Sequence, residues 1–357
     1  MPWAQTCLPA MSSTLDPRGL TARRARQVLT GLGASSLLLG LVACLPPPLG
    51  SAQATGAPSR GVVNLPTDSR LPRAADGRSY PVVPSNPAAI AGLLTTVEVA
   101  LRSGTTPAAD LAQLGHQQQV IYRVLSHRPD LANQVRAYLA PRWQLVLDQH
   151  MVARRAFLEM RRGKSPAVKV PAWRIIPPEP AANLLGYYRA AAAATGIPWE
   201  VLAAVNLVES GMGRIDGVSI ADARGPMQFL PSTWAEAGIG KGGDIRNPQD
   251  AIHAAARYLV RRGGLKDIRK GLWGYNNSDQ YGRAVLAYAS LIKEDPAAYT
   301  GLYHWEVHYP TVAGDLWLPV GYDQARPLAV ATFLQQSPAS APPAAVAAIL
   351  ISQQAKP

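Results

Sequence analysis

Cysteine is nearly absent from this chain. Only Cys7 and Cys44 occur among 357 residues, and both fall in an N-terminal segment that we expect to be removed or modified with lipid. This scarcity excludes a disulfide framework, thiolate zinc sites and a cysteine nucleophile.

Charged residues are also scarce, at 16% of the chain, whereas apolar residues make up 48%. The 32 prolines and 30 glycines interrupt the polar remainder. This composition excludes a coiled coil, a collagen and a wholly disordered chain, and the length suits two domains or one domain with tails. The few charges are unbalanced, since the formal net charge is +12. Such a charge suits an anionic partner, which could be nucleic acid, a membrane surface or a wall polymer.

The N-terminus carries the pattern of an export signal. Three arginines within residues 23–26 precede an apolar run over residues 28–45, which is short for a membrane span. A small-x-small site at residues 52–54 predicts a signal peptide over residues 1–54 and free secretion. A lipobox-like sequence ending at Cys44 would instead leave a lipidated N-terminus. An uncleaved buried helix is a third alternative.

We therefore expect a secreted or cell-envelope protein, attached to the membrane only if Cys44 is lipidated. Removal of residues 1–54 takes away four arginines and Asp16, which leaves a formal charge of +9. Outside the cytoplasm the abundant polyanions are wall polymers and lipid head groups. We accordingly expect anionic wall polymers as further partners and no nucleic acid.

Proline positions and apolar spacing predict a helical N-terminal block. Residues 55–86, rich in Pro, Ser, Arg and Gly, predict a flexible linker. Apolar residues at three- and four-residue intervals then predict a helical block over residues 87–163. Its expected helices cover residues 87–102, 107–125 and 129–162, and Pro141 should break the last one. The pairs Arg154-Arg155 and Arg161-Arg162 indicate a solvated face.

The remaining chain divides into four segments. The proline-rich residues 164–179 predict a connector, and residues 180–296 return to a dense helical pattern. Alternation over residues 303–309 and the Gly314-Asp315 turn predict a β-hairpin within a 297–336 extension. Residues 337–357, rich in Ala and Pro, predict a disordered tail.

One glutamate stands in an apolar helical stripe. Pro198 suits the start of a helix and Gly211 its end. Glu209 lies four residues after Val205 and seven after Leu202, so its side chain should point into the packed face. Loss of solvation and the negative end of the helix dipole both disfavour its ionised form. A carboxyl that stays protonated near neutral pH can donate a proton to a glycosidic oxygen.

Further motifs follow Glu209 in a fixed order. They are Glu209-Ser210, the loop-like run Ser219 to Gln228, Asn247 to Ile252, Ala255 to Leu259, and Tyr275-Asn276 with Tyr288 downstream. This series resembles the soluble lytic transglycosylase (SLT) domain of the lysozyme superfamily over residues 180–295. The whole arrangement resembles the enzymes of high-GC Gram-positive bacteria. The resemblance implies a mainly α, lysozyme-like α+β fold, in which residues 180–296 form the catalytic domain.

The resemblance also implies an activity that needs no cofactor and no metal. Family members cleave the bond between N-acetylmuramic acid (MurNAc) and N-acetylglucosamine (GlcNAc) in peptidoglycan glycan strands. By motif, Glu209 would protonate the leaving oxygen and then take a proton from the muramic C6 hydroxyl, which closes a 1,6-anhydro ring. One carboxyl acting twice suffices, in contrast to glycosidases with two carboxylates.

The other expected site residues come from the same resemblance. Ser219 and Gln228 match positions that hydrogen-bond the sugars, and Met227 matches a residue that lines the cleft. Tyr275 and Asn276 match a Tyr-Asn element whose tyrosine hydroxyl contacts the catalytic carboxyl. The tyrosines of helical stripes, Tyr258, Tyr281 and Tyr288, are expected in the core.

Two positions depart from the family pattern and leave an alternative open. Asp222 stands where relatives usually have glycine, and Pro226 replaces a common leucine. If Asp222 reached the cleft it could position a water molecule, as in goose-type lysozymes, and the protein would be a muramidase that hydrolyses the same bond.

Two alternatives from other classes also remain. Alternation would place His304, Glu306 and His308 on one strand face, which suggests a zinc peptidase, although the spacing fits no metalloprotease helix. The basic charge and the uninterpreted helical block would also suit a non-catalytic peptidoglycan-binding module.

Overall fold

The computed structural model describes residues 63–341 and 343. The expected signal peptide over 1–54, residues 55–62 of the expected linker, and residues 342 and 344–357 of the expected tail lie outside the described residues. Within them, no helix is long and apolar enough to cross a membrane. The fold is mainly α, as the sequence predicts, with three two-stranded sheets.

The predicted helical block is confirmed. It consists of α1 (Pro87–Arg102), α2 (Ala108–His127), α3 (Pro129–Ala137) and α4 (Pro141–Arg161). Asn86 caps α1 by accepting hydrogen bonds from the amides of Ala88 and Ala89. Proline occupies the first turn of α1, α3 and α4, where its missing N–H has no helical partner to lose. The break expected at Pro141 is therefore the start of α4.

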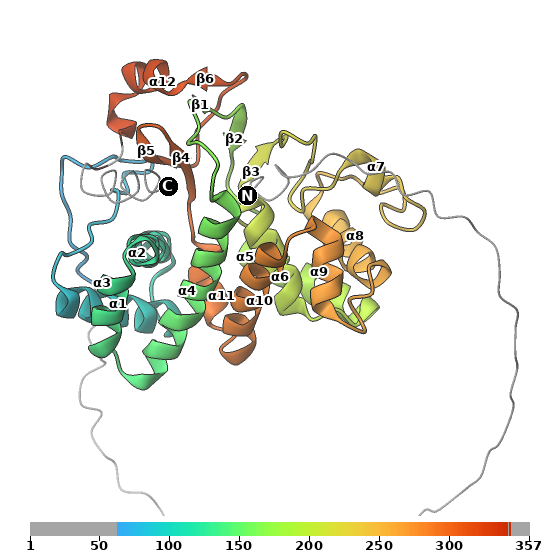
Figure 1. Ribbon diagram of the computed structural model, residues 1–357, viewed down its shortest axis with the longest axis horizontal. Helices are drawn as coiled ribbons and strands as arrows, with labels where there is room; N and C mark the ends of the chain where they lie inside the picture. The colour runs from blue at the N-terminus through green and yellow to red at the C-terminus, as the bar shows by residue number, and fades with distance from the viewer. Residues whose placement is uncertain (1–62, 342, 344–357) are drawn as a thin grey trace, which may run out of the picture. The chain divides into compact units, whose positions relative to one another are not determined.

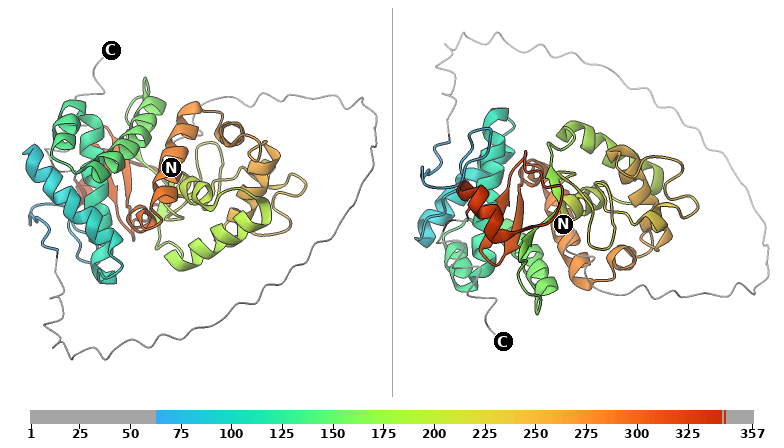
Figure 2. Two further views of the ribbon diagram at one scale, coloured as in Figure 1. Left: turned by 90° about the horizontal axis from the view of Figure 1, so that it is seen from below. Right: turned by 90° about the horizontal axis from the view of Figure 1, so that it is seen from above.

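The central part of the chain adds seven helices in the described residues. They are α5 (Ala181–Thr195), α6 (Trp199–Ser210), α7 (Pro231–Trp234), α8 (Pro248–Arg261), α9 (Ile268–Asn276), α10 (Asp279–Glu294) and α11 (Ala298–Tyr303). Figure 1 shows α1–α4, in blue to green, on one side of α10 and α11, and α7–α9 on the other side. The two views of Figure 2 keep this order.

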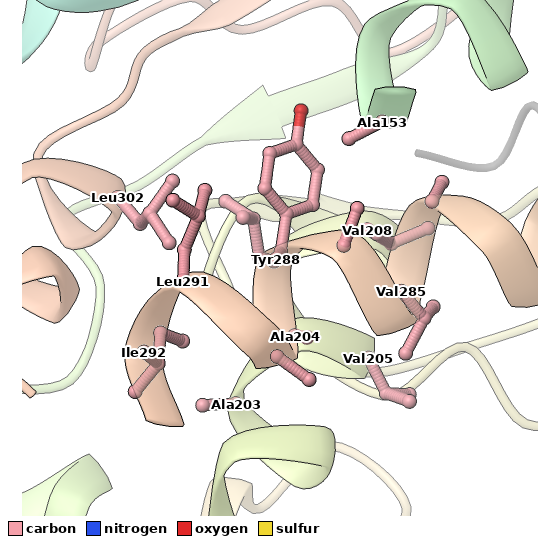
Figure 3. Close-up of a cluster of buried hydrophobic side chains, with 14 of the residues drawn as sticks. Ala153, Ala203, Ala204, Val205, Val208, Val285, Tyr288, Leu291, Ile292 and Leu302 are labelled. Carbon is pink, nitrogen blue, oxygen red and sulfur yellow. The ribbon is translucent and has the colours of Figure 1, made fainter. Parts of the chain in front are cut away.

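Helix α10 is shared by both groups of helices. It packs against α4 of the N-terminal block and against α6 of the central part. Figure 3 shows the contact, in which Tyr288 of α10 points toward Ala153 of α4 while Val205 and Val208 of α6 pack nearby. These side chains belong to one continuous buried cluster. The helix that faces the candidate site thus rests on the N-terminal block.

The predicted β-hairpin is present but starts later than the alternation suggests. Its strands are β4 (Val307–Thr311) and β5 (Gly314–Leu318), paired antiparallel with Thr311 opposite Gly314. Residues 303–306 do not belong to it, because Tyr303 ends α11 and His304 caps that helix. The 297–336 extension also contains β6 (Leu328–Ala329) and α12 (Val330–Gln336).

The expected connector over residues 164–179 is more ordered than its prolines suggest. It contributes β1 (Lys169–Val170), which pairs with β6, and β2 (Trp173–Ile175), which pairs with β3 (Ile215–Gly217). The apolar side chains of these strands form a second core with the hairpin. The expected disordered tail likewise begins with a 3₁₀ turn at Pro338–Ser340.

The expectation of a flexible linker is wrong for residues 63–86. This segment has no helix or strand, but Tyr80 is buried against Val120 of α2 and Trp317 of β5. Arg78 forms a 2.7 Å ion pair with Glu306. A polar, proline-rich composition here accompanies a segment that packs on its neighbours through Tyr80 and smaller apolar side chains such as Leu71 and Ala74.

The solvated face expected for the arginine pairs of α4 is also corrected in part. Arg155 and Arg162 are exposed, whereas Arg154 is buried and its Nε atom has no hydrogen-bond partner among the described residues. Burial lowers the pKa of Arg154 to about 10. Helix α4 packs against both α2 and α10, so neighbouring helices cover much of its surface. Of the consecutive residues Arg154 and Arg155, the first therefore faces inward.

Candidate active site

Glu209 lies at the end of α6 and is fully buried, with no exposed surface. Gly211 ends the helix in the left-handed conformation, at φ 61°, which glycine adopts without strain. Burial raises the pKa of the Glu209 carboxyl to about 7, because the ionised form loses its solvation. The group is thus largely protonated below neutral pH, as its place in the apolar stripe predicts.

A tyrosine from α10 holds one oxygen of this carboxyl. The Tyr281 hydroxyl donates a 2.8 Å hydrogen bond to Oε1 of Glu209. Tyr281 lies in the first turn of α10, where its amide donates to the capping Ser278 hydroxyl at 3.2 Å. The other oxygen, Oε2, is buried and has no hydrogen-bond partner among the described residues.

The tyrosine expected at this carboxyl was therefore the wrong one. Tyr275 donates its hydroxyl hydrogen bond to the carbonyl oxygen of Met227, at 2.8 Å. Its ring lies parallel to that of Tyr281, with the two centroids 6.2 Å apart. Sequence reasoning assigned Tyr281 to the core because it follows the apolar spacing of α10, and the residue is indeed buried. Its place three residues after the cap Ser278, at the helix end nearest the Tyr-Asn element, was the signal that could have found it.

The loop between Val218 and Leu230 lies over the end of α6. The carbonyl oxygen of Pro226 accepts a 2.8 Å hydrogen bond from the Asn206 amide and another from the Ser210 hydroxyl. Gly225 has no room for a side chain, because a Cβ atom there would lie 1.9 Å from the carbonyl oxygen of Ile245. These contacts place Pro226 and Met227 against α6, whose last turn carries Glu209.

The predicted loop residues have internal roles as well. Ser219 is nearly buried, and its hydroxyl accepts hydrogen bonds from the amides of Ala221 and Ala223 at 3.2 and 3.0 Å. Gln228 has φ 50° and donates to the Gly225 carbonyl oxygen at 2.9 Å. Met227 is buried in the main core. The side chains of Ser219 and Gln228 thus shape the loop. The positive φ of the buried Gln228 is backbone strain of the kind that functional sites retain.

Asn276 differs from the other predicted residues. It follows Tyr275 at the end of α9, and both atoms of its side-chain amide are buried without a hydrogen-bond partner in the described part of the chain. A buried amide that lacks partners costs free energy. Both the donor and the acceptor of the Asn276 amide are therefore unsatisfied within the described residues.

Hydrogen bonds and ring contacts join Glu209, Tyr281, Tyr275 and Met227 into one group. Ser219 and Gln228 belong to the loop that carries Met227. The Asn276 side chain forms no hydrogen bond with this group in the described residues. The roles expected for these residues toward a substrate stay predictions.

Among the described residues, the Asp222 side chain forms no hydrogen bond or ion pair with Glu209, Tyr281, Tyr275 or Met227. Its carboxylate is 56% exposed and forms a 3.0 Å ion pair with Arg224. Its φ of 65° explains why a glycine would suit this position. The structure therefore favours the surface-loop interpretation of Asp222.

The three residues that suggested a zinc site do not share a strand face. His304 caps α11, Glu306 pairs with Arg78, and the Nδ1 atom of His308 lies 3.2 Å from Asp315. Among the described residues, no group of three His, Cys, Asp or Glu side chains is arranged to hold a metal ion.

Comparison with protein-family models matches residues 186–290 to the transglycosylase SLT domain. The matched segment runs from within α5 to within α10 and so includes Glu209, the loop, Tyr275 and Tyr281. No curated protein and no solved structure matches the chain. The family resemblance seen in the motifs is thereby confirmed, whereas the link to high-GC Gram-positive bacteria stays a prediction.

Proposed function

We propose that this protein is a lytic transglycosylase with Glu209 as its single acid and base. The match of residues 186–290 to the transglycosylase SLT domain, a type of domain that cleaves peptidoglycan, supports this proposal. The protein would cleave the β-1,4 bond between MurNAc and GlcNAc and leave a 1,6-anhydro-MurNAc end. One observation carries the proposal: a fully buried carboxyl with a pKa of about 7 has one oxygen held by Tyr281, while the other has no hydrogen-bond partner among the described residues.

The hydrogen bond from Tyr281 determines where the proton of Glu209 resides. Oε1 accepts the hydrogen bond of the tyrosine hydroxyl, so in the protonated acid the hydrogen sits on Oε2, which has no partner in the part of the chain that the structure describes. Burial keeps this proton on about half of the molecules at pH 7, where an ordinary glutamate would have lost it almost completely. The acid is thus prepared to donate to a substrate oxygen.

The proposed reaction uses the Glu209 carboxyl twice, first as the donor of that proton and then as a base. Glu209 donates the proton to the GlcNAc oxygen as the bond from that oxygen to the muramic C1 atom breaks. The resulting carboxylate then takes the proton of the muramic C6 hydroxyl, whose oxygen bonds to C1. The acid is restored, and no water enters the product.

A hydrolytic muramidase finds less support. Glycosidases that add water or form a covalent intermediate usually have a second carboxylate near the acid. The candidate for that role, Asp222, is exposed and paired with Arg224. A non-catalytic wall-binding module has no use for a buried protonated carboxyl, whose burial costs free energy without a compensating partner at Oε2.

The proposed substrate also bears on location. Peptidoglycan lies outside the cytoplasm, so this function requires export. We therefore propose a secreted or cell-envelope protein, for which the signal-like sequence over residues 1–54 is the support.

The test is mass spectrometry of the muropeptides released by the purified protein. The parent should yield fragments lighter by one water than hydrolysis products, and Glu209→Gln should release them about a hundred- to ten-thousand-fold more slowly. Glu200→Gln is the matched control, because Glu200 lies in the first turn of the same helix, away from the site. A fully active Glu209→Gln protein, or products with added water, would refute the proposal.

A further inference from the structure

A group of unpaired cations lies where α8 meets α9. The sequence from Arg261 to Lys270 contains five cations and a single acid, Asp267. Arg261 is occupied, since it pairs with Glu236 at 2.9 Å. The other four are exposed and have no ion-pair partner in the described residues, and we call them the basic corner: Arg262, Lys266, Arg269 and Lys270.

Close backbone contacts hold the basic corner together. A Cβ atom at Gly274 would lie 2.9 Å from the Arg262 side chain, and one at Gly263 would lie 3.8 Å from Lys270. The stem of Arg262 therefore runs along α9, and Lys270 reaches back over the end of α8. Figure 1 shows these two helices side by side.

Arg262 is also fixed in orientation. Its guanidinium lies over the ring of Tyr258, 4.7 Å from the centroid, and donates a 2.6 Å hydrogen bond to the Tyr258 hydroxyl. The Tyr258 ring in turn contacts Tyr275 edge-on, with centroids 5.5 Å apart. A long cationic side chain on the surface is usually free to move, whereas these contacts fix Arg262. Through Tyr258 and Tyr275 the contacts continue to Tyr281, which holds the Glu209 carboxyl.

The placement of two of these cations does not serve stability. Arg269 and Lys270 stand in the first turn of α9, which contains no acidic residue. The positive end of the helix dipole repels cations there, whereas acidic side chains would be favourable. Asp267 only partly relieves this, because its carboxylate already accepts the amide hydrogens of Arg269 and Lys270. The two cations thus create a positive potential at a position where they destabilise the helix, and this indicates that the position binds an anionic ligand.

The basic corner lies within reach of the candidate site. Tyr275 and Asn276 end the same helix that begins beside Arg269 and Lys270. Tyr275 follows Lys270 by five positions in the α-helix, a rise of about 7.5 Å along its axis. Trp273, 52% exposed, stands between them. An anionic group attached to a sugar in the site could extend over this distance.

We propose that the basic corner binds the carboxylates of the peptide stems that MurNAc residues carry, and so makes the protein prefer stem-bearing glycan strands. The inference rests on the proposed function for the identity of the strand. Anionic wall polymers offer phosphate instead, but they are not necessarily attached next to the bond being cut. A stem is attached to the very sugar whose ring closes.

The test compares a double variant, Arg269→Gln with Lys270→Gln, with a charge-matched control, Arg128→Gln with Arg155→Gln. The control pair is exposed and lies in the N-terminal block. Substrates are glycan strands with stems, the same strands after an amidase has removed the stems, and stem-free strands that keep phosphate polymer. The corner variant should raise KM about three- to tenfold on stem-bearing strands alone, with kcat unchanged.

Binding to the inactive Glu209→Gln protein, measured by co-sedimentation, separates the two proposals. Retention of stem-bearing strands should fall about three- to tenfold when Arg269→Gln and Lys270→Gln are introduced into the Glu209→Gln protein. High salt should cause a similar fall in the Glu209→Gln protein with the basic corner intact. An equal loss on stripped strands, a loss only with phosphate polymer, or retention by anionic lipid vesicles in place of strands would overturn the inference. If strands bind through their stems but the parent protein never cuts them, the proposed function is refuted. The inference that the basic corner binds the stems would then still hold.

Discussion

The Tyr281 hydroxyl and the Glu209 carboxyl join helices α10 and α6 across 72 residues of sequence through one 2.8 Å hydrogen bond. The bond favours the ionised carboxyl and so opposes burial, which favours the neutral acid. It also fixes which carboxyl oxygen, Oε2, is left without a hydrogen-bond partner in the described residues. The two residues together set both the pKa and the direction of the proton.

Removal of that hydroxyl should therefore have two effects. In Tyr281→Phe the pKa of Glu209 should rise further, because a hydrogen bond to the ionised form is lost. The carboxyl should also lose its orientation, which we expect to lower kcat about ten- to a hundredfold. The kcat/KM profile against pH should show its alkaline limb at higher pH than in the parent.

Tyr288→Phe is the matched control for this substitution. Tyr288 lies two turns further along α10, and its hydroxyl is buried without a hydrogen-bond partner in the described residues. Its removal should leave activity unchanged and unfolding free energy within about 1 kcal/mol. If both variants lost activity equally, the effect would come from the packing of α10 and not from Glu209.

The activity of the parent should fall on the alkaline side of neutrality. The proposed reaction starts from the protonated acid, and the pKa of Glu209 is about 7. Above that pH, kcat/KM should decrease about tenfold per pH unit. A rate that stays constant up to pH 9 would show that Glu209 does not act as the first proton donor.

The same pKa predicts how stability depends on pH. A carboxyl raised from 4.5 to about 7 binds its proton more tightly in the folded state. Its contribution is therefore complete below pH 4.5 and is lost as pH rises through 7, by about 3 kcal/mol in total. Glu209→Gln lacks this group, so its unfolding free energy relative to the parent should increase by that amount between pH 4.5 and 8. Denaturant titration of both proteins at the two pH values measures the difference, and other ionisable groups cancel.

Asp222→Gly should change neither products nor stability by much. Glycine suits the φ of 65° better, and the substitution removes only an exposed ion pair with Arg224. We expect unfolding free energies within about 1 kcal/mol and the same anhydro products by mass spectrometry. Any hydrolysed fraction that disappears in this variant would show that Asp222 does position water.

The sequence predicts helices well where local chemistry decides them. Asn86, Pro129 and Pro141 fix where α1, α3 and α4 begin, and their residue types have the same effect in any fold. Tyr80 and Arg154 were misjudged because their surroundings are set by distant segments. Tyr80 packs against β5, more than two hundred residues later, and Arg154 faces inward because α4 has neighbours on two sides.

The candidate site divides in the same way. The burial of Glu209 follows from the spacing of its own helix, so the sequence could predict its raised pKa. Its tyrosine partner also depends on how α10 crosses α6: the cap at Ser278 marks the end of α10 that carries Tyr281, but it does not show which hydroxyl reaches the carboxyl. Tyr275 and Tyr281 are six residues apart and stack in parallel, so motif order alone could not decide which hydroxyl reaches the carboxyl.

Helix α10 is covered on one flank by α4 and on the other by α6. A fragment beginning at residue 164 would retain every residue of the matched domain yet leave the Tyr288 side of that helix uncovered. Such a fragment should aggregate when it is produced alone, and adding residues 63–163 as a separate chain should restore it. The region without recognisable chemistry would then be as necessary for lysis of the wall as the acid itself.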